Sequence, residues 1–341
     1  MRAAGGSNRW VQLFGLGLSV LAVVILLGAV DVGETASILV TADPRFIVLA
    51  ATLVVVQLLV VTARWWLLLA GISGGPVPYH RLVGPVLIGY LGNFALPSRL
   101  GEVVRAILVS RREHRPMTEV FGSVVLERLI DASVLAWVAL ITAAVLDAPA
   151  WIFNIAAIAA IVAAVALVIL ATPAAQAMAR RLGRARAGML RTLGAAIGGF
   201  AYGARVRDRA RAVALAVVLS AVSWLIEGSV YWLAARSLGL EVSPAVAFLV
   251  AAVTVLATAV PSAPAYVGTF ELAVTAVATA FGVPAPDALA WALLAHAVTV
   301  APLAIGGIIA LVVSGLRASD VIHDAEQAEI SMDAGLGRQE S

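Results

Sequence analysis

The sequence contains no cysteine and no lysine, and it has few charged residues of any kind. The absence of cysteine excludes disulfides, thiolate metal sites and cysteine nucleophiles, and the absence of lysine excludes Schiff-base chemistry. Only 13% of the 341 residues are charged, compared with about 25% in soluble globular chains. Hydrophobic residues make up 62%, more than a soluble domain of this length can bury. The composition therefore indicates an integral membrane protein, and the net charge of +3 does not suggest a nucleic-acid partner.

Apolar runs of about 20 residues, the length that crosses the hydrocarbon core of a bilayer, recur along the whole chain. We expect an all-α, polytopic membrane bundle in which residues 1–316 form one transmembrane domain. The first run follows Arg2 and Arg9 and is longer than the apolar core of a signal peptide, so we interpret it as an uncleaved span. The six expected full spans are residues 10–30, 46–70, 118–146, 151–172, 211–235 and 287–313.

Two further apolar regions, residues 82–110 and 244–282, are interrupted by proline and glycine. The arms on either side of each interruption are about 10–17 residues long, too short for a full span. Membranes tolerate such breaks where protein or a wet cavity satisfies the freed backbone groups. We therefore predict two re-entrant or broken-helix hairpins. Tilted arms that each span the membrane are the alternative.

Arginine is unevenly distributed among the loops. Residues 180–211 contain nine arginines and one aspartate, whereas the loops on the opposite side carry mainly acidic residues. Because cytoplasmic loops are enriched in basic residues, we predict a multi-pass protein of the cytoplasmic (inner) membrane with both termini in the cytoplasm. We expect residues 176–209 to form a cytoplasmic linker or an amphipathic helix, and residues 317–341 a disordered cytoplasmic tail.

The order of elements repeats with opposite orientation. Two groups of elements follow the same order of span, broken region and span. The first group is 46–70, 82–110 and 118–146, and the second is 211–235, 244–282 and 287–313. The two groups enter the membrane from opposite sides. Inverted repeats with discontinuous helices are typical of transporters, whose binding sites lie at the breaks. We predict that the two breaks, near Pro97 and Pro264, approach one another near the membrane centre.

Charged residues inside the apolar segments are the strongest chemical signal. A charge at the centre of a spanning helix costs about 2.5–3.5 kcal/mol, so such residues persist where they pair, face the bundle interior or act on a substrate. The spacing of Glu127, Arg128 and Asp131 allows an ion pair and places two carboxylates on one helix face. Arg99 and Arg105 lie near the start of a half-helix, where free N–H groups also favour an anion such as phosphate. An ion-pair network that only fixes hairpin to helix is the alternative.

Four other polar residues lie within apolar segments. Glu227 and Glu271 are acids for which a hydrogen-bonded structural role and a substrate contact are both open. We interpret His296 as a packed or helix-bonding residue in preference to a proton relay. Arg64 lies near the cytoplasmic end of its helix, and we expect its side chain to extend to the interface. The spacing of the histidines does not suggest a metal site, so no metal or cofactor is expected.

Three motifs carry a resemblance to a known family. They are Asn93-Phe-Ala-Leu-Pro97-Ser-Arg99-Leu-Gly101-Glu102-Val-Val-Arg105, Glu127-Arg128-Leu-Ile-Asp131 and Pro261-Ser-Ala-Pro264-Ala-Tyr-Val-Gly268-Thr-Phe-Glu271. From about residue 10 to 315, the sequence resembles the flippase-like membrane family related to the transmembrane part of lysylphosphatidylglycerol synthases. In that family two glycines usually follow the second proline of the third motif, whereas this sequence has Ala265 and Tyr266.

The resemblance implies translocation of a lipid between leaflets, often an aminoacylated or otherwise modified phospholipid, without identifying the lipid. Family members that synthesise such a lipid carry a soluble transferase domain, which no segment here is long or polar enough to form, so we expect no enzymatic activity. The leading hypothesis is a translocase of a phosphate-bearing lipid. An ion- or proton-coupled transporter of a small solute is the runner-up, and a membrane enzyme acting on a polyprenyl lipid and an accessory scaffold are further alternatives.

In the leading hypothesis, arginines receive the head group and acids orient them. The expected partners are membrane lipids, and a homo-oligomer or a separate lipid-modifying enzyme is left open. The arginines are Arg99, Arg105 and Arg128, and their acids are Glu102, Glu127 and Asp131. The full set of candidate substrate-binding residues is Asn93, Arg99, Gly101, Glu102, Arg105, Glu127, Arg128, Asp131, Glu227, Pro264, Gly268 and Glu271.

Overall fold

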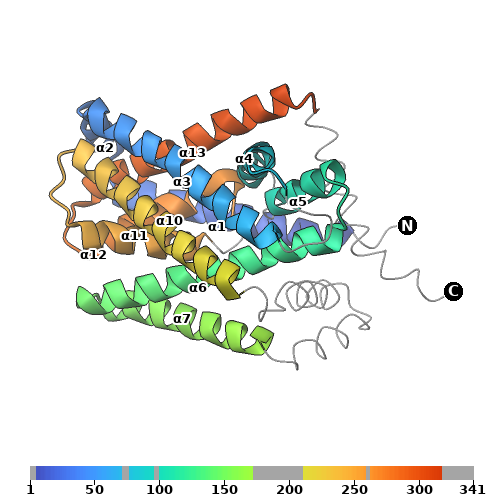
Figure 1. Cartoon of the computed structure of the whole chain (residues 1–341). Coiled ribbons are helices and arrows are strands. Elements are labelled where there is room, and N and C mark those ends of the chain that lie inside the picture. The colour runs from blue at the N-terminus through green and yellow to red at the C-terminus, as the bar shows by residue number, and fades with distance from the viewer. Residues whose placement is uncertain (1–4, 71–76, 96–99, 172–209, 259–261, 317–341) are drawn as a thin grey trace.

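The computed structural model describes residues 5–70, 77–95, 100–171, 210–258 and 262–316, and within these ranges it contains helices and no β-strand (Figure 1). The prediction of an all-α chain is confirmed. The elements are α1 (Gly5–Ala29), α2 (Val32–Val40), α3 (Pro44–Leu69), α4 (His80–Ala95), α5 (Gly101–Arg112), α6 (Met117–Val145), α7 (Ala150–Ala171), α10 (Ala210–Ser237), α11 (Pro244–Ala257), the 3-10 turn η2 (Pro264–Tyr266), α12 (Thr269–Ala280) and α13 (Ala285–Val313).

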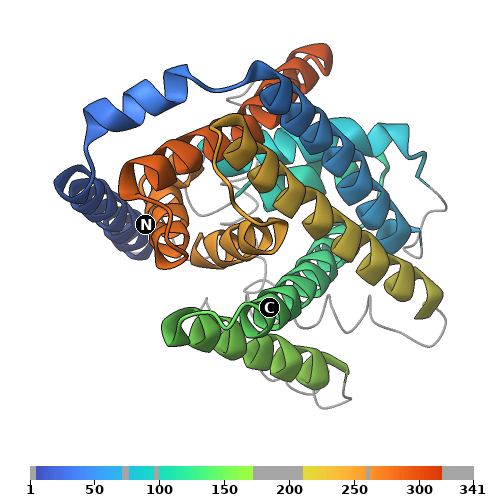
Figure 2. The ribbon, with the colours of Figure 1, turned by 90° about the vertical axis from the view of Figure 1, so that its left-hand side faces the viewer.

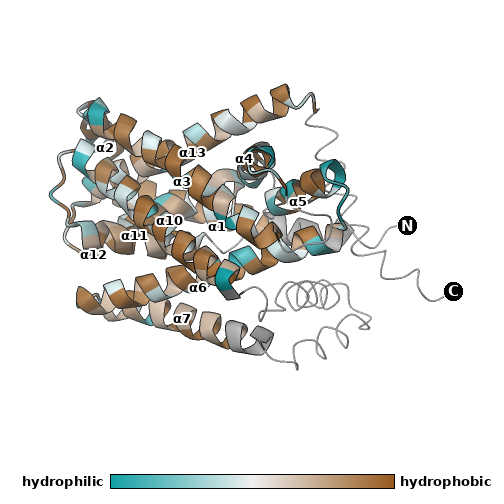
Figure 3. Cartoon of the chain, viewed as in Figure 1, coloured by the Kyte–Doolittle hydropathy of each residue, from teal (hydrophilic) through white to brown (hydrophobic). Residues whose placement is uncertain are grey.

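Several helices are suited to a membrane. In the described part of the chain, α3, α10 from Arg211 onward, and α13 are long and apolar enough to cross one, and α1 with α2 is a fourth candidate. Large apolar side chains are exposed along α1, α3, α7, α10 and α13, and Figure 3 shows hydrophobic residues over most of the length of the long helices. Surfaces of this size need lipid or another apolar cover.

The N-terminal region contains α1, which covers most of the expected span 10–30, and the short helix α2, which the sequence did not predict. α1 and α2 are separate helices, bent by 88° at the break between them. Asp31 begins α2, because its side chain accepts the backbone N–H of Glu34 (3.0 Å) and so caps a new helix. Figure 2 shows α1 at the edge of the bundle, where it packs against α12.

α3 and α10 pack against each other in antiparallel orientation. The backbone N–H of Asp43, just before α3, donates to the carbonyl oxygen of Ser237 at the end of α10 (2.7 Å). Farther along, Arg64 near the end of α3 contacts Ser220 near the start of α10. The start of α3 is well defined, since Asp43 caps it and Pro44 occupies a first-turn position that needs no N–H donor.

Each predicted broken region is a pair of packed helices. α4 packs against α5 around the first break, whose residues 96–99 lie outside the described ranges, and α11 packs against α12 around the second. The first pair is close because a Cβ on Gly101 would overlap the carbonyl oxygen of Gly89 on α4. The turn η2 of the second break packs against α4. The second break therefore reaches the helix that leads into the first, while the re-entrant placement of these arms stays a prediction.

The backbone of the second break suits glycine at the two positions where the resemblance implies glycine. Ala265 and Tyr266 have φ angles of +53° and +63°, and Gly268 has a φ of +87°. This left-handed region costs an L-residue roughly 1–2 kcal/mol, whereas glycine adopts it freely. The turn is therefore conformationally strained at the two positions where this sequence has no glycine.

Some sequence predictions fall outside the described residues. They concern the arginine-rich segment that includes 176–209, the tail 317–341, and Pro97, Arg99 and Pro261.

Candidate functional site

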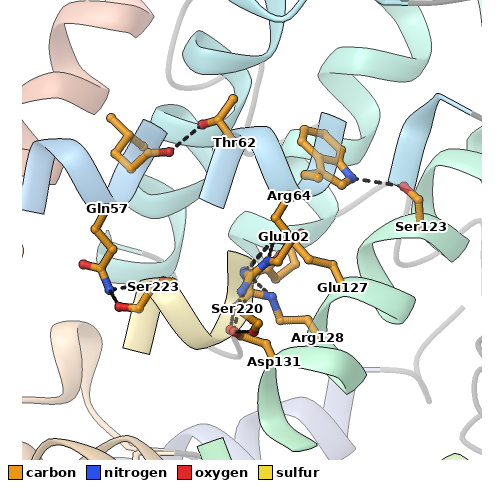
Figure 4. Close-up of polar contacts among 12 residues, drawn as sticks. Gln57, Thr62, Arg64, Glu102, Ser123, Glu127, Arg128, Asp131, Ser220 and Ser223 are labelled. Atoms are coloured by element: carbon orange, nitrogen blue, oxygen red, sulfur yellow. Dashed lines mark hydrogen bonds and ion pairs between the residues drawn. The ribbon is translucent and has the colours of Figure 1, made fainter. Parts of the chain in front are cut away.

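Arg64 lies at the centre of a buried cluster of charged side chains (Figure 4). Its Nε and Nη2 donate to Oε1 of Glu127 on α6 at 3.2 and 2.9 Å, and its Nη1 donates to Asp131 on the same helix and to Oγ of Ser220 on α10 (2.9 Å). The side chain is 1% exposed. The prediction that Arg64 extends to the interface is therefore wrong. It stays inside because two carboxylates of α6 face it, and their negative charge compensates the buried guanidinium.

Arg105 brings the first hairpin into the same cluster. Its Nη2 lies 2.7 Å from Oε2 of Glu127 and 2.5 Å from Oε2 of Glu102, and its side chain is 3% exposed. Its guanidinium also lies 4.7 Å from the ring centre of Trp65 on α3, a cation–π contact. Trp65 is held in turn by its indole N–H, which donates to Ser123 Oγ (3.0 Å). Glu127 thus binds α3 through one carboxylate oxygen and α5 through the other.

Arg128 is the accessible guanidinium of the cluster. Its side chain is 39% exposed, and its nitrogens lie 3.5 Å from Glu102, 3.8 Å from Glu127 and 3.7 Å from Asp131. These separations allow ion pairing but exceed good hydrogen-bond lengths. Turning Arg128 toward another anion therefore costs less interaction energy than turning Arg64 or Arg105.

The structure brings together most of the residues that the sequence predicts to interact. Glu102, Arg105, Glu127, Arg128 and Asp131 form one contiguous network, to which Asn93 donates a hydrogen bond at Glu102 (3.2 Å); this prediction is confirmed for these residues. Arg99 lies outside the described ranges. Gly101 belongs to the contact between α4 and α5 described above.

A small cavity lies between α4, α5 and α6 beside this network. Its volume is about 10 Å³, room for about one water molecule. Four buried atoms of its lining have no hydrogen-bond partner among the described residues: Asn93 Oδ1, Glu102 Oε2, Arg105 Nε and Arg128 Nε. Glu102 forms ion pairs with Arg105 and Arg128, but its Oε2 and the two arginine Nε atoms are not aligned for hydrogen bonds. Because buried polar atoms are nearly always hydrogen-bonded, this lining suits a small polar or charged group.

The remaining candidates form a second group in α10 to α13. Glu227 accepts a hydrogen bond from Nε2 of Gln57 on α3 (2.8 Å). Glu271 Oε1 lies 2.5 Å from Nδ1 of His296, and Oε2 accepts the backbone N–H of Gly268 (2.7 Å). Pro264 begins the turn η2 of the same break. The sequence indicated neither His296 as the partner of Glu271 nor Arg64 as the centre of the first cluster.

One signal could have identified Arg64. Gln57 and Arg64 are seven residues apart, two helical turns, so their side chains lie on the same face of α3. Two polar groups on one face of an otherwise apolar helix indicate polar partners across that face. In the structure those partners are on α6 and α10.

Two other observations bear on the choice of site. A larger cavity, about 280 Å³, lies between residues 240–246 and 281–284, away from the arginine cluster. Its lining is mostly apolar with Glu241 as the charged residue, so it offers no cation to an anionic ligand. Within the described ranges, no group of three or more His, Cys, Asp or Glu side chains could hold a metal ion.

Comparison with known proteins gives one family and two relatives. Residues 12–307 match the family model described as the lysylphosphatidylglycerol synthase TM region. Glycosyltransferase AglD from Haloferax volcanii is 32% identical over 133 residues, which are 39% of this chain and 21% of AglD. UPF0104 membrane protein MJ1595 from Methanocaldococcus jannaschii is 26% identical over 119 residues, 34% of this chain and 35% of that protein. Since the family model covers most of its length, the chain belongs to the family of the lysylphosphatidylglycerol synthase transmembrane region.

Proposed function

We propose that this protein translocates a phosphate-bearing lipid between the leaflets of the cytoplasmic membrane, with Arg105 and Arg128 as ligands of the head group. The cavity beside the first hairpin carries this proposal. Two guanidinium Nε–H donors without hydrogen-bond partners face it from α5 and α6. A planar guanidinium suits phosphate oxygens, and a site inside a membrane domain favours a lipid over a soluble anion. The family, named for an enzyme of lipid synthesis, supports a lipid substrate.

Glu102 is the acid that a head group would replace. Among the described residues the cluster contains three guanidiniums and three carboxylates, so it is electrically balanced. Glu127 is fixed by hydrogen bonds from α3 and α5, and Asp131 by hydrogen bonds from α3 and α10. The Glu102 side chain is 20% exposed and lies in the first turn of α5, next to the break. A phosphate can take its place on both arginines without separating the long helices.

We also infer that α3–α6 and α10–α13 form an inverted repeat. Packing contacts in one half have counterparts in the other: α4 packs on α13 as α11 packs on α6, and α3 packs on α13 as α10 packs on α6. The equivalent helices α3 and α10 are antiparallel, so the axis relating them is perpendicular to both. With helices along the membrane normal, that axis lies in the membrane plane, the arrangement of alternating-access transporters. The proposed orientation, with both termini in the cytoplasm, rests on the arginine content of residues 180–211.

The proposal assigns transport and no chemical step to this domain. The printed name of AglD describes a glycosyltransferase, but the shared stretch covers 21% of that protein. The carboxylates of the arginine cluster are all engaged by guanidiniums and so are poorly placed to act as general bases.

The test is reconstitution into liposomes with fluorescent phosphatidylglycerol, phosphatidic acid and phosphatidylcholine, read by the fraction of each probe accessible to an impermeant quencher. We expect the wild-type protein to accelerate exchange of at least one phosphate-bearing lipid, and Arg128→Gln to slow it at least tenfold. Arg81→Gln is the matched control, because Arg81 is 46% exposed in a surface ion pair. Exchange no faster than in empty liposomes, or an Arg128→Gln protein as active as the wild type, would overturn the proposal.

A further inference from the structure

The pair Glu271–His296 occupies the same place in the second half as Glu102–Arg128 does in the first. Arg128 is the twelfth residue of the 29-residue helix α6, and His296 is the twelfth residue of the 29-residue helix α13. Both acids lie in the first turn of a 12-residue helix that follows a break, α5 or α12. In each half an acid of the short helix therefore meets a basic residue at the same level of the next long helix.

The basic partners differ in one chemical property. A guanidinium stays charged at any physiological pH, so the pair in the first half is a permanent ion pair. An imidazole is the side chain whose charge ordinarily changes between about pH 5 and 8. The pair in the second half can therefore gain and lose a proton where the pair in the first half cannot.

The surroundings of His296 assign that proton to one nitrogen. Nδ1 lies 2.5 Å from Glu271 Oε1, so it holds its proton toward the carboxylate in both charge states. The ring stacks on Phe270 with 4.3 Å between ring centres, and the side chain is 11% exposed. Nε2 is then the atom at which a proton enters or leaves. With that proton the pair is neutral overall, and without it a net negative charge remains at Glu271.

Few other charged groups act on this pair. α11 carries no charged residue, α12 carries only Glu271, and Asp287 is the other charged residue of α13, at its outer end. The other helices packed against α12 and α13 contain these titratable or charged residues: Arg9 in α1, Glu34 in α2, Arg45 and Arg64 in α3, His80, Arg81 and Tyr90 in α4, and Arg211, Glu227, Tyr231 and Arg236 in α10. The Tyr231 ring centre lies 6.0 Å from that of Phe270, which stacks on His296.

Glu271 connects this pair to the second break. Its Oε2 accepts the backbone N–H of Gly268, the residue with a φ of +87° that ends the break. A Cβ on Gly268 would lie 2.6 Å from the carbonyl oxygen of Ser19 on α1, and the Ser19 hydroxyl accepts the N–H of Ala263 at the other end of the break (2.8 Å). η2, between these residues, packs against α4, which lines the arginine-cluster cavity. One carboxylate thus joins the imidazole to a strained segment that reaches both α1 and the first hairpin.

We propose that Glu271 and His296 form a proton-binding site that couples proton movement to rearrangement of the second break. A proton binds Nε2 of His296 from one side of the membrane, forming an N–H bond, and leaves from the same atom to the other side when that bond breaks; no other bond changes. Loss of the proton leaves the Glu271 carboxylate without a cationic partner and so strengthens its hydrogen bond from the Gly268 N–H, whereas gain of the proton weakens that hydrogen bond. The site itself needs only the geometry of α12 and α13, while its role in transport rests on the proposed lipid translocation.

The first experiment tests the site without transport. Protein with ¹⁵N-labelled histidine is placed in lipid nanodiscs, and the His296 signals are assigned by their loss in His296→Gln. We expect the Nε2 signal to change with pH while Nδ1 stays protonated, and we expect Glu271→Gln to change that response because it removes the carboxylate that faces Nδ1. Nitrogen signals of His296 that do not change from pH 5 to 9 would overturn the proposal.

The second experiment applies a gradient of one pH unit across the liposomes used above, in either direction. We expect the leaflet distribution of the transported lipid to shift by up to about tenfold, the equilibrium equivalent of one pH unit. In His296→Gln the lipid distribution should lose its dependence on the gradient, and the exposed loop-proximal His80→Gln should behave as the wild type. A wild-type protein whose lipid distribution does not depend on the gradient would refute proton coupling but not lipid translocation. Absence of exchange for every lipid would instead refute the proposed function.

Discussion

Replacement of Arg64 by methionine tests whether the buried cluster supports the bundle. Methionine fills much of the same volume without charge, so the change removes the hydrogen bonds to Glu127, Asp131 and Ser220. It leaves three carboxylates with two guanidiniums among the described residues. Removing one partner from a buried ion pair costs about 3–5 kcal/mol, because the other partner stays buried without compensation. We therefore expect Arg64→Met to lower the free energy of unfolding by about that amount.

A charge-balanced variant separates the loss of charge from the loss of contacts. In Arg64→Met with Asp131→Asn, the cluster again has equal numbers of acids and guanidiniums, so we expect roughly half of the loss to be recovered. Unfolding is measured in lipid bicelles by denaturant titration followed by tryptophan fluorescence. Arg81→Met is the control, since an exposed ion pair contributes about 0–1 kcal/mol. An Arg64→Met protein within about 1 kcal/mol of the control would refute the reasoning.

Three smaller changes test the packing, the turn and the second acid. Gly101→Ala should prevent close packing of α4 on α5 and reduce the yield of monodisperse protein, whereas Gly84→Ala, with open space at its Cβ, should not. Ala265→Gly should preserve or slightly raise the melting temperature, and Ala265→Val should lower it by an amount equivalent to more than about 1 kcal/mol, because φ is +53° there. Gln57→Leu should cost about 1–3 kcal/mol by leaving Glu227 without its hydrogen bond, and adding Glu227→Leu should recover most of that loss in the same unfolding assay.

Helix positions could be predicted from the sequence because long apolar runs have few alternatives in a membrane. Spans 46–70 and 287–313 agree with α3 and α13 to within a few residues. The expected span 10–30 ends where α1 ends, but the helix α2 after it was not predicted, although Asp31 followed three residues later by Glu34 is a recognisable helix-start pattern. α2 has nine residues, too few for the hydropathy of a full span to indicate it.

Helical spacing could predict the pairs of the site only where their contacts are local in sequence. Helical spacing placed Arg128 beside Asp131, three residues away on α6. Arg64 is 63 residues from Glu127, and Glu271 is 25 residues from His296 on another helix. No periodicity relates residues at such separations, so these pairs follow from the tertiary packing of α3 on α10 and of α12 on α13.

The direction of coupling follows from charge balance. The arginine cluster is neutral among its described residues, so an entering phosphate head group adds negative charge to the membrane interior. A proton on His296 adds one positive charge in the same domain. An uncompensated charge at the centre of a membrane costs about 2.5–3.5 kcal/mol. The lipid-bound state therefore has its lowest free energy when the proton is bound as well. We therefore expect the lipid to accumulate in the leaflet on the alkaline side of an imposed pH gradient, measured by quencher accessibility, and accumulation on the acidic side would contradict co-transport.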